Sequence, residues 1–437
     1  MNTFRPGQTV WLEIAGERCE IVELLGSGGQ GQVYRTALNG QDYALKWYFP
    51  TCATAEQRAA IERLVHKGPP NDRFLWPLDI ALCQGLASFG YLMPLREPRF
   101  RGLAQMMNRE VDPTFRTLTN VALELADSFL RLHSLGLCYS DISFGNLFFD
   151  PVTGEIAICD NDNVAVDGEG LSGVLGTPRF MAPEIVCGLA RPAANTDLYS
   201  LAVMLFYIFM MHHPLEGRRE REIGCLDLAA MQKLYGSEAL FIFDPKQGAN
   251  RPVAGVHNNA TLFWNFYPGY VRDVFTRAFT EGLRDPTARV RESEWRTVFT
   301  RMRDQIFYCH KCGAENFLTN EGDLSQPIEG HECWHCGEVP LPPLRLRLGH
   351  HSIVLNQDTL LYPHHLDVNR RNDYSEILAE MVPHPKRPDV WGLRNISAQN
   401  WTSFPPSGAP VEVPAGRSIT LVQGLRLRFG NVEGTVL

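Results

Sequence analysis

The first third of the chain alternates short strand-like runs with longer helical ones. TVWLEI, CEIVELL and QDYALKWYF switch between apolar and polar positions or form short apolar runs, which predicts strands near 9–14, 19–25 and 41–49. TAEQRAAIERLV has helical spacing from about residue 54. TLTNVALELADSFLRLHSLG predicts a strong amphipathic helix over 117–136, which the final glycine ends.

Two short apolar runs follow this helix. LFFD and EIAICD flank the turn sequence DPVTG, which predicts a hairpin over 147–160. Helical patterns then dominate to about residue 305. The longest apolar run, Leu198–Met211, is too short to span a bilayer, and Asp197 and His212 flank it, so we expect a buried core helix there.

The last third of the chain changes character twice. Residues 306–338 are short, polar and punctuated by cysteines. The proline-rich stretch EVPLPPL is typical of a semi-rigid linker, and strand-like runs continue from 344 to 437. We therefore expect three domains, over 1–305, 306–338 and 344–437, and the spacing of the last strands predicts a small β-sandwich.

Composition, charge and cysteine number indicate the class of protein and its location. The 437 residues are 44% hydrophobic and 21% charged, as in ordinary globular proteins. A net charge of −8 argues against broad binding of nucleic acid or anionic membranes. The N-terminus lacks the basic and apolar regions of a signal peptide, and the eleven cysteines are odd in number. We expect a cytoplasmic, reducing location, with the paired cysteines binding a metal.

A glycine-rich stretch opens the candidate chemistry. LLGSGGQGQVY places Gly26, Gly28 and Gly31 before Val33, and glycines let a backbone approach phosphate oxygens closely. Taken alone, this stretch is more typical of a hairpin loop without a ligand. Lys46 lies in the middle of the next apolar run, where a charge is costly without a partner.

Three oxygen-bearing side chains follow the long helix. Asp141 and Asn146 are five residues apart, and Asp160 ends the next predicted strand. Each one alone is more typical of a turn. Together, behind a glycine loop and a lysine, they could supply a carboxylate near an attacking hydroxyl and ligands for magnesium.

This ordered set resembles the eukaryotic-like serine/threonine protein kinases of bacterial type. The motifs stand here as GSGGQGQV, YALK, YSDISFGN, DND and APE, and GTPRFMAPE, TDLYSLAVML and DPTAR continue the resemblance over about 18–303. The resemblance implies an α+β, bilobal kinase fold. We expect a small lobe over about 1–95 and a large lobe over about 96–305.

The resemblance also implies roles for single residues, with ATP and Mg²⁺ or Mn²⁺ as cofactors. Lys46 would hold the phosphates and pair with a helix glutamate, for which Glu62 is favoured over Glu56. Asp141 would accept or orient the proton of the substrate hydroxyl. The metal ligands would be Asn146 and Asp160, and the nucleotide would contact Gly26, Gly28, Gly31, Val33, Ala44 and Met93.

Supporting positions follow the same resemblance. Asp197 would hold the backbone of the catalytic loop, and Glu184 would pair with Arg289. Thr177 matches a threonine that contacts the catalytic aspartate in serine/threonine kinases, which favours serine or threonine as acceptors.

Three motifs depart from the family pattern, at four positions. Ser140 replaces an arginine, which predicts activity independent of phosphorylation of the activation loop. Ser143 replaces a lysine that neutralises the transferring phosphoryl group, which predicts lower turnover or a substitute cation. Tyr139 and Asn161 replace two spine residues, and we expect a polar contact between these two side chains.

Two C-x-x-C pairs carry the second candidate site. Cys309, Cys312, Cys333 and Cys336 have the spacing of a four-cysteine zinc ribbon, with a structural Zn²⁺. Two disulfides or free thiols are the alternative. His310 or His335 could also replace a cysteine as ligand.

The tail resembles a degenerate forkhead-associated domain. Ser397, Asn400 and Thr402 match the family's Ser…Asn-Gly-Thr turn, but Glu376 and Leu378 stand near Ser375 where phosphate-reading residues are expected. We expect a domain that packs or docks partners, and not a phosphothreonine reader.

The sequence therefore predicts ATP- and magnesium-dependent phosphorylation of serine or threonine on proteins, including the chain itself, in signalling or stress response. The alternatives are a nucleotide-binding pseudokinase scaffold, which docks partners through the ribbon and the tail, and a small-molecule kinase. The resemblance implies a metal-dependent protein phosphatase and a von Willebrand A-type protein as partners. We expect neither membrane nor nucleic acid as a partner.

Overall fold

The computed structural model describes residues 3–168, 176–318, 332–349, 351–367 and 369–437. Contacts divide the chain into two compact units. The N-terminal unit comprises Met1–Thr261 and Val274–Ser293, and the C-terminal unit comprises Leu262–Asp273 and Glu294–Leu437. The predicted boundary at 305 stays a prediction, because each unit consists of two separate segments and no single point of the chain divides them.

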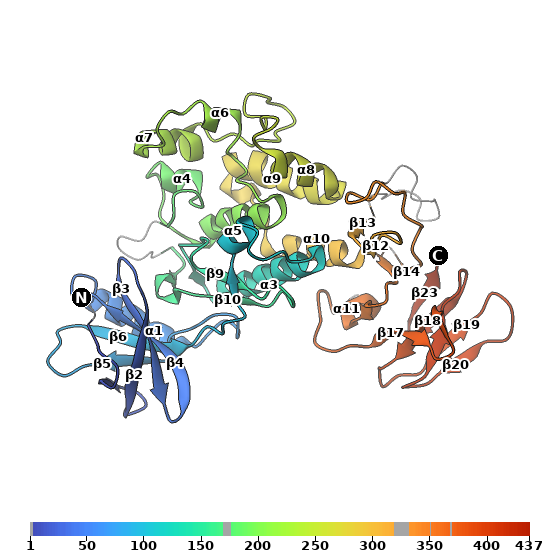
Figure 1. Cartoon of the computed structure of the whole chain (residues 1–437), viewed down its shortest axis with the longest axis horizontal. Helices are drawn as coiled ribbons and strands as arrows, with labels where there is room; N and C mark the ends of the chain where they lie inside the picture. Colours follow the sequence, from blue (N-terminus) through green and yellow to red (C-terminus); the bar gives the residue numbers. More distant parts are fainter. Residues whose placement is uncertain (1–2, 169–175, 319–331, 350, 368) are drawn as a thin grey trace. The chain divides into compact units, whose positions relative to one another are not determined.

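The small lobe is built on a closed six-stranded barrel (Figure 1). Its strands are antiparallel and lie in the order β1 (Thr9–Leu12), β2 (Glu17–Ser27), β3 (Gly31–Leu38), β4 (Gln41–Tyr48), β6 (Phe89–Pro94) and β5 (Asp79–Leu82). The alternation seen in the sequence turns Val10, Leu12, Cys19 and Ile21 inward, where they pack against Leu45 and Trp47.

Helix α1 (Ala55–Lys67) lies beside this barrel. Thr54 caps its first turn by accepting a hydrogen bond from Gln57 N. Ala60, Ile61 and Leu64 are its buried residues, so one face of the helix packs inward.

The large lobe is mainly helical. α3 (Phe115–Ser134) buries the face predicted from the sequence and packs on α5 (Ala194–Met210). Nearly all of α5 is buried, as expected for a helix that is apolar on every side. The other helices that begin in this unit are α2 (Leu103–Met107), α4 (Pro183–Val186), α6 (Arg218–Arg221), α7 (Leu228–Met231), the π-helix η2 (Gln232–Ser237), α8 (Asn258–Phe266), the 3-10 helix η3 (Pro286–Ala288) and α10 (Glu292–Asp304).

Short strands carry the site residues of the large lobe. β9 (Leu147–Phe149) and β10 (Ile156–Ile158) form the predicted hairpin, with β7 (Arg101–Gly102) at the other edge of β9. β8 (Leu137–Cys138) pairs with β11 (Ala165–Val166). The 3-10 helix η1 (Asn161–Asn163) follows β10.

The C-terminal unit includes the first residues of α9, a small hairpin and two sheets. α9 runs over Gly269–Arg284, and β12 (Ile306–Tyr308) pairs with β13 (Glu315–Phe317). The first sheet has the order β15 (His351–Val354), β14 (Arg345–Leu348), β23 (Val432–Val436), β22 (Arg426–Phe429), β19 (Trp401–Phe404) and β20 (Val411–Val413). The second has the order β16 (Leu360–Leu361), β17 (Ala379–His384), β18 (Arg387–Asn395) and β21 (Ser418–Thr420), and α11 (Pro363–Leu366) follows β16.

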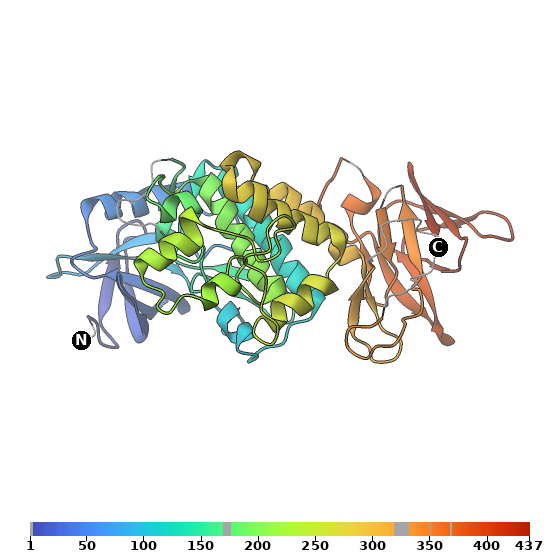
Figure 2. The ribbon, with the colours of Figure 1, turned by 90° about the horizontal axis from the view of Figure 1, so that it is seen from above.

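The two sheets share one apolar core. Leu346, Leu427 and Trp401 of the first sheet belong to the same buried cluster as Leu393 and Ala379 of the second. The C-terminal strands are drawn in orange and red in Figure 2. This arrangement is the small β-sandwich that the strand spacing predicts. Among the helices of the described residues, none has both the length and the apolar content that a bilayer span requires.

Candidate functional site

The segment between β8 and β9 brings three predicted site residues together. Thr177 Oγ1 donates to Asp141 Oδ1 over 2.9 Å. Asn146 Nδ2 lies 2.8 Å from Asp141 O and 3.2 Å from Asp141 Oδ2. The amide of Asn146 therefore braces the loop, and its oxygen points away from these bonds and is free to accept a cation.

A buried carboxylate holds the start of this loop. Asp197 of α5, 1% exposed, accepts hydrogen bonds from Tyr139 N at 2.5 Å and from Ser140 N at 3.0 Å. Ser140 has φ +70°, in the left-handed region that costs energy for a residue with a side chain. The two bonds to Asp197 fix this strained turn immediately before Asp141.

Asp160 stands at a second strained position. Its φ of +48° ends β10 and starts η1, which turns its carboxylate toward Lys46 Nζ at 3.4 Å. Burial raises the pKa of Asp160, while Lys46 opposes that rise. Two non-glycine residues in left-handed conformation thus flank the candidate chemistry, a concentration of strain that is typical of functional sites.

One cavity of about 400 Å³ collects most of these groups. Its lining consists of Gly28, Gly29, Gln30, Gly31, Val33, Lys46, Asp141, Asp160, Asn163, Gly176 and Thr177. Gly26 is not part of this lining, but it pairs in the β2–β3 ladder with Val33, which is. Ala44 and Met93 are both buried and pair with each other across β4 and β6, outside the lining.

Gly31 is required by packing and not by the cavity. A Cβ at this position would lie 2.1 Å from Trp47 O, whereas positions 26, 28 and 29 have open space. The close approach of β3 to β4 explains the third glycine of the loop. Gly28 N donates to Gly31 O over 2.9 Å inside the loop, and the open space beside Gly26, Gly28 and Gly29 lets a ligand approach this backbone closely.

Lys46 finds its partners on the segment after β10. Its Nζ lies 2.9 Å and 2.8 Å from the two carboxylate oxygens of Asp162, and 3.2 Å from Gln30 Oε1. Burial opposes the charge on this ammonium, but Asp162 and Asp160 outweigh it and raise the pKa of Lys46. The ammonium is therefore charged inside the protein.

The expected pair between Lys46 and Glu62 is wrong for this structure. Glu62 Oε1 bonds Arg58 Nε at 2.9 Å, one helical turn away. The reason is helix phase: Ile61 and Leu64 define the inward face, and Glu62 lies off that face. Glu56, the second choice, is exposed at the first turn of α1 and does not reach Lys46 either.

The protein kinase domain family matches residues 19–252, more than half of the chain. This chain belongs to the protein kinase family. A DNA damage-responsive serine/threonine-protein kinase of Deinococcus radiodurans is 30% identical over 219 residues, 47% of this chain and 32% of that protein. A serine/threonine-protein kinase of Mycobacterium bovis is 27% identical over 206 residues, 45% of this chain and 18% of that protein.

A more distant relative extends the comparison to a eukaryote. A probable cell cycle serine/threonine-protein kinase of Encephalitozoon cuniculi is 25% identical over 207 residues, 46% of this chain and 43% of that protein. The chain thus spans less than half the length of these kinases. The family match ends at residue 252, before the cysteine pairs and the β-sandwich.

The large lobe of the kinase domain contains an ion pair that the resemblance also implies. Arg289 Nη2 lies 2.8 Å from Glu184 Oε2, and its side chain is 2% exposed. Arg289 Nη1 also donates to Asn195 O at 2.9 Å. The pair expected from the sequence is present and ties α4 to the segment before α10.

The expected polar contact between Tyr139 and Asn161 is wrong. The hydroxyl of Tyr139 donates to Cys159 O, and its ring packs edge-on to Phe129. Asn161 Nδ2 donates to Leu75 O and to Ile158 O, both at 2.9 Å. Each side chain therefore donates to backbone carbonyls near it, and the two side chains do not bond each other.

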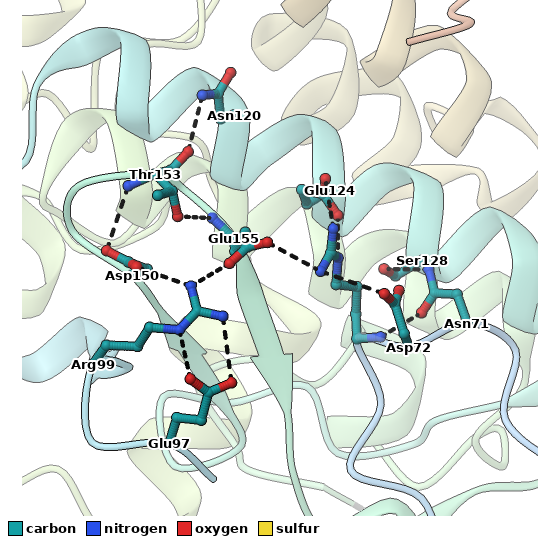
Figure 3. A network of polar contacts seen from close by, with 11 residues as sticks. Asn71, Asp72, Glu97, Arg99, Asn120, Glu124, Ser128, Asp150, Thr153 and Glu155 are labelled. Carbon is teal, nitrogen blue, oxygen red and sulfur yellow. Dashed lines mark hydrogen bonds and ion pairs between the residues drawn. The ribbon is translucent and has the colours of Figure 1, made fainter. Parts of the chain in front are cut away.

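A charged network braces the hairpin that carries Asn146 and Asp160 at its two ends (Figure 3). Arg99 contacts Glu97 and Asp150 at 3.0 Å each, and also contacts Glu155. Asp150 accepts from Val152 N at 2.8 Å and closes the turn. These bonds hold the β9–β10 turn in place.

The same network reaches the loop before β5. Arg73 Nε bonds Glu124 of α3 at 2.7 Å, and Asn71 bonds Ser128 of the same helix at 3.0 Å (Figure 3). Phe74 forms a parallel bridge with Ile158. The loop before β5 is therefore anchored to both α3 and β10, the strand that precedes Asp160.

The four cysteines form a compact cluster in the C-terminal unit. Sγ of Cys309 lies 3.8 Å from that of Cys336, and Sγ of Cys312 lies 3.7 Å from that of Cys333. Four sulfurs about 2.3 Å from one Zn²⁺ in a tetrahedron are about 3.8 Å apart. None of the four is in a disulfide, so the two-disulfide alternative is wrong for this structure, and zinc and free thiols stay as the two predictions for the cluster.

A second cluster has the ligand types but not the protonation for a metal. Asp304, His364 and His365 lie within 4.8 Å of one another. His365 Nδ1 accepts from Tyr362 N at 2.9 Å, so its proton is on Nε2, which donates to Asp304 at 3.2 Å. These bonds explain the cluster as the attachment of α11 to the end of α10.

The sandwich turn that resembles a forkhead-associated domain is bonded internally. Ser397 Oγ lies 2.7 Å from Asn395 Oδ1, and Asn400 Nδ2 lies 2.7 Å from Glu412 Oε1. Ser375 Oγ accepts from Arg370, which also pairs with Glu376 at 3.0 Å. The cation nearest to Ser375 is already neutralised by carboxylates of its own loop.

Sequence reasoning missed three site residues, namely Tyr48, Gln57 and Asp162. Asp162 carried a signal, because a carboxylate stands where the kinase pattern has glycine. A buried lysine also requires a partner, but the family pattern indicates a glutamate of the helix and not a carboxylate after β10.

Proposed function

We propose that this kinase transfers the γ-phosphoryl group of ATP to serine or threonine of protein substrates, with magnesium. The observation that carries the proposal is one cavity lined by glycine backbone, Lys46, Asp141 and Asp160, with Thr177 bonded to Asp141. Phosphoryl transfer depends on positioning and on charge stabilisation, and this cavity offers groups for both.

Each residue has a separate task in the proposed reaction. Lys46 and the glycine-rich loop that lines the cavity bind the phosphates. Asp160 and Asn146 offer oxygen ligands of the kind that magnesium prefers, and the metal would neutralise charge on the phosphates. Asp141 orients the substrate hydroxyl and takes its proton as the hydroxyl oxygen bonds to the γ-phosphorus and the bond to the β-phosphate oxygen breaks.

The acceptor class follows from Thr177. Its hydroxyl fixes Asp141 at 2.9 Å, and it precedes the APE segment that builds a protein-facing surface in the family. The small-molecule alternative is disfavoured on these grounds. Phosphoamino-acid analysis of the labelled product tests this assignment: phosphotyrosine as the main product would contradict it.

Control of the site is proposed to be independent of loop phosphorylation. Ser140 offers no cation for a phosphate, and Lys46 is the only cation among the described residues that line the cavity. Ser172, a hydroxyl residue of the predicted activation loop, lies outside the described residues. Replacing Ser172 and the other loop hydroxyls except Thr177 by alanine should leave activity intact, and loss of activity would contradict the idea.

Incubation of the full chain with labelled ATP and Mg²⁺ tests the function. Label should enter the chain itself or casein, and Asp141→Ala and Asp160→Ala should abolish incorporation. Bound ATP without transfer in the wild type would favour the alternative, a pseudokinase scaffold that docks partners through its C-terminal unit. Mn²⁺ should replace Mg²⁺, since the ligands are oxygens.

We further propose that the cysteine cluster holds a structural Zn²⁺. The sulfur spacing supports it, and Asn316 Nδ2 lies 3.5 Å from Cys333 Sγ, as a donor that would steady a thiolate. Native mass spectrometry should find one zinc per chain, and Co²⁺ should give the spectrum of a tetrahedral thiolate site. Cys312→Ser should lose both, whereas Cys225→Ser, an exposed cysteine outside the cluster, should lose neither.

The cellular setting is also a proposal. Free thiols throughout the chain favour a cytoplasmic, reducing location. A metal-dependent protein phosphatase and a von Willebrand A-type protein are proposed partners from resemblance, and a signalling or stress response is the proposed context. Affinity purification of the tagged chain from its host should recover both partners, and their absence would withdraw them.

A further inference from the structure

The carboxylate that holds Lys46 comes from the loop after β10. Both oxygens of Asp162 lie within 2.9 Å of Lys46 Nζ, and the exposed fractions of the two side chains are 0% and 7%. A buried ammonium is stable only beside a buried countercharge of this kind. Asp160, at 3.4 Å, is the more distant and the more exposed of the two aspartates.

Helix α1 contributes a neutral side chain at the position that faces this pair. Gln57 Nε2 donates to Tyr48 Oη at 3.1 Å and lies 3.4 Å from Asp162 O. Tyr48 Oη in turn donates to Asp162 Oδ2 at 2.5 Å. Gln57 is one turn before the buried Ile61, so both lie on the inward face of the helix.

The glutamate of the same helix is engaged elsewhere. Glu62 bonds Arg58, and Arg58 Nη2 also bonds Glu13 at 2.6 Å, in the turn after β1. The side chain of Glu62 is 44% exposed. This chain of charges runs along the outer face of α1, so Glu62 would have to leave Arg58 to approach Lys46.

We propose that Asp162 is the positioning residue of Lys46. The family pattern has the carboxylate partner of this lysine on the helix and a glycine after β10. Here the carboxylate lies after β10, as Asp162, and the side chain on α1 is the neutral Gln57, so we call Gln57 and Asp162 an exchanged pair. The inference rests on the proposed use of ATP. Because the ion pair does not include α1, a shift of α1 would leave Lys46 paired. Movement of the helix would reach the site only through the hydrogen bonds of Gln57.

An exchange experiment on the full chain tests this directly. Steady-state kinetics with MgATP and casein would compare Asp162→Asn, Glu62→Gln, Asp162→Gly and the double variant Gln57→Glu/Asp162→Gly. MgATP affinity would be measured on the same proteins by calorimetry. Thermal unfolding would show which variants are folded.

The expected pattern separates the two carboxylates. Asp162→Asn should lower kcat/KM for ATP on the order of a hundredfold, since a displaced positioning group has effects of this size. Glu62→Gln should stay within about twofold, because Glu62 lies off the site. The double variant should regain about tenfold or more over Asp162→Gly, a rescue that a purely structural role would not produce.

Three results would overturn the proposal. They are a loss in Glu62→Gln equal to that in Asp162→Asn, a wild-type value in Asp162→Asn, and no gain in the double variant. If Asp162→Asn does not fold, the Glu62→Gln arm still decides which carboxylate is used. If the wild type binds MgATP without transfer, the proposed function fails, but the affinities of the same variants still test the exchanged pair.

Discussion

His133 should make the stability of the kinase domain depend on pH above neutrality. The side chain ends α3 and is 10% exposed, with Nε2 3.2 Å from Asp197 and Nδ1 bonded to Glu292. Burial opposes a charge on the ring, but the bonds to Asp197 and Glu292 outweigh it and raise the pKa from 6.5 to about 9. His133 is therefore a cation at neutral pH, held between two carboxylates.

The magnitude follows from linkage. A folded pKa above the unfolded one gives stability that is fully present below about pH 6.5 and is lost as the pH rises through about 9. The difference of about 2.5 units corresponds to about 3 kcal/mol, at 1.36 kcal/mol per unit. His133→Gln keeps a hydrogen-bonding side chain but removes the titration.

Urea unfolding of the wild type and His133→Gln, at pH 6 and pH 9.5, measures this contribution. The difference in unfolding free energy between the two proteins should be larger at pH 6 by about 3 kcal/mol, and taking that difference cancels the other titrating groups. NMR titration of ¹³C-labelled histidine should place one ring near pH 9. If no ring that is lost in His133→Gln titrates near pH 9, or if the difference does not change with pH, the prediction is wrong.

Three further predictions concern packing around the site. Gly31→Ala should lower the melting temperature, because its Cβ would meet Trp47 O, whereas Gly28→Ala, in open space, should melt like the wild type; equal melting of the two would contradict this. Asn161→Phe should cost about 1–3 kcal/mol of unfolding free energy by overpacking a side chain with 0% exposure, and an unchanged denaturation midpoint would argue against it. Arg289→Met should cost about 3–5 kcal/mol by leaving Glu184 unpaired, and the double variant with Glu184→Gln should cost less; additive losses would rule out a coupled pair.

The sequence predicts most of the fold because its periodicities and motifs are local. The amphipathic pattern over α3 and the turn sequence between β9 and β10 each depend on neighbours in the chain, and both elements are present. The spacing of Asp141 and Asn146 predicts that the two act together, the resemblance adds Thr177, and the structure brings all three together. Their roles in catalysis remain to be measured.

The partner of Lys46 could not be predicted in the same way. Which face of α1 turns inward depends on Thr54 as its cap and on Ile61 and Leu64 as its anchors, and the sequence alone does not show that these residues take Glu62 out of reach. The contact between Lys46 and Asp162 joins residues 116 positions apart, through two lobes of the fold. A residue pattern along one helix carries no information on such a pair.

The bonds of Tyr139 and Asn161 show the same limit at shorter range. Both residues were recognised as polar replacements in an apolar spine, which is a local observation. Their partners are carbonyls of Cys159, Leu75 and Ile158, and carbonyl direction depends on the fold around them. Polar side chains in a core most often satisfy the backbone, and this kinase follows that rule.

The most direct test of the account is a time course of phosphate transfer from labelled ATP and Mg²⁺ to casein. The wild-type chain and Asp141→Asn would be compared at equal occupancy of ATP. The account predicts repeated turnover by the wild type and a loss of at least about a hundredfold in Asp141→Asn, whose amide cannot take the proton of the hydroxyl. Equal incorporation by the two proteins, or none by a wild type that binds ATP, would contradict it.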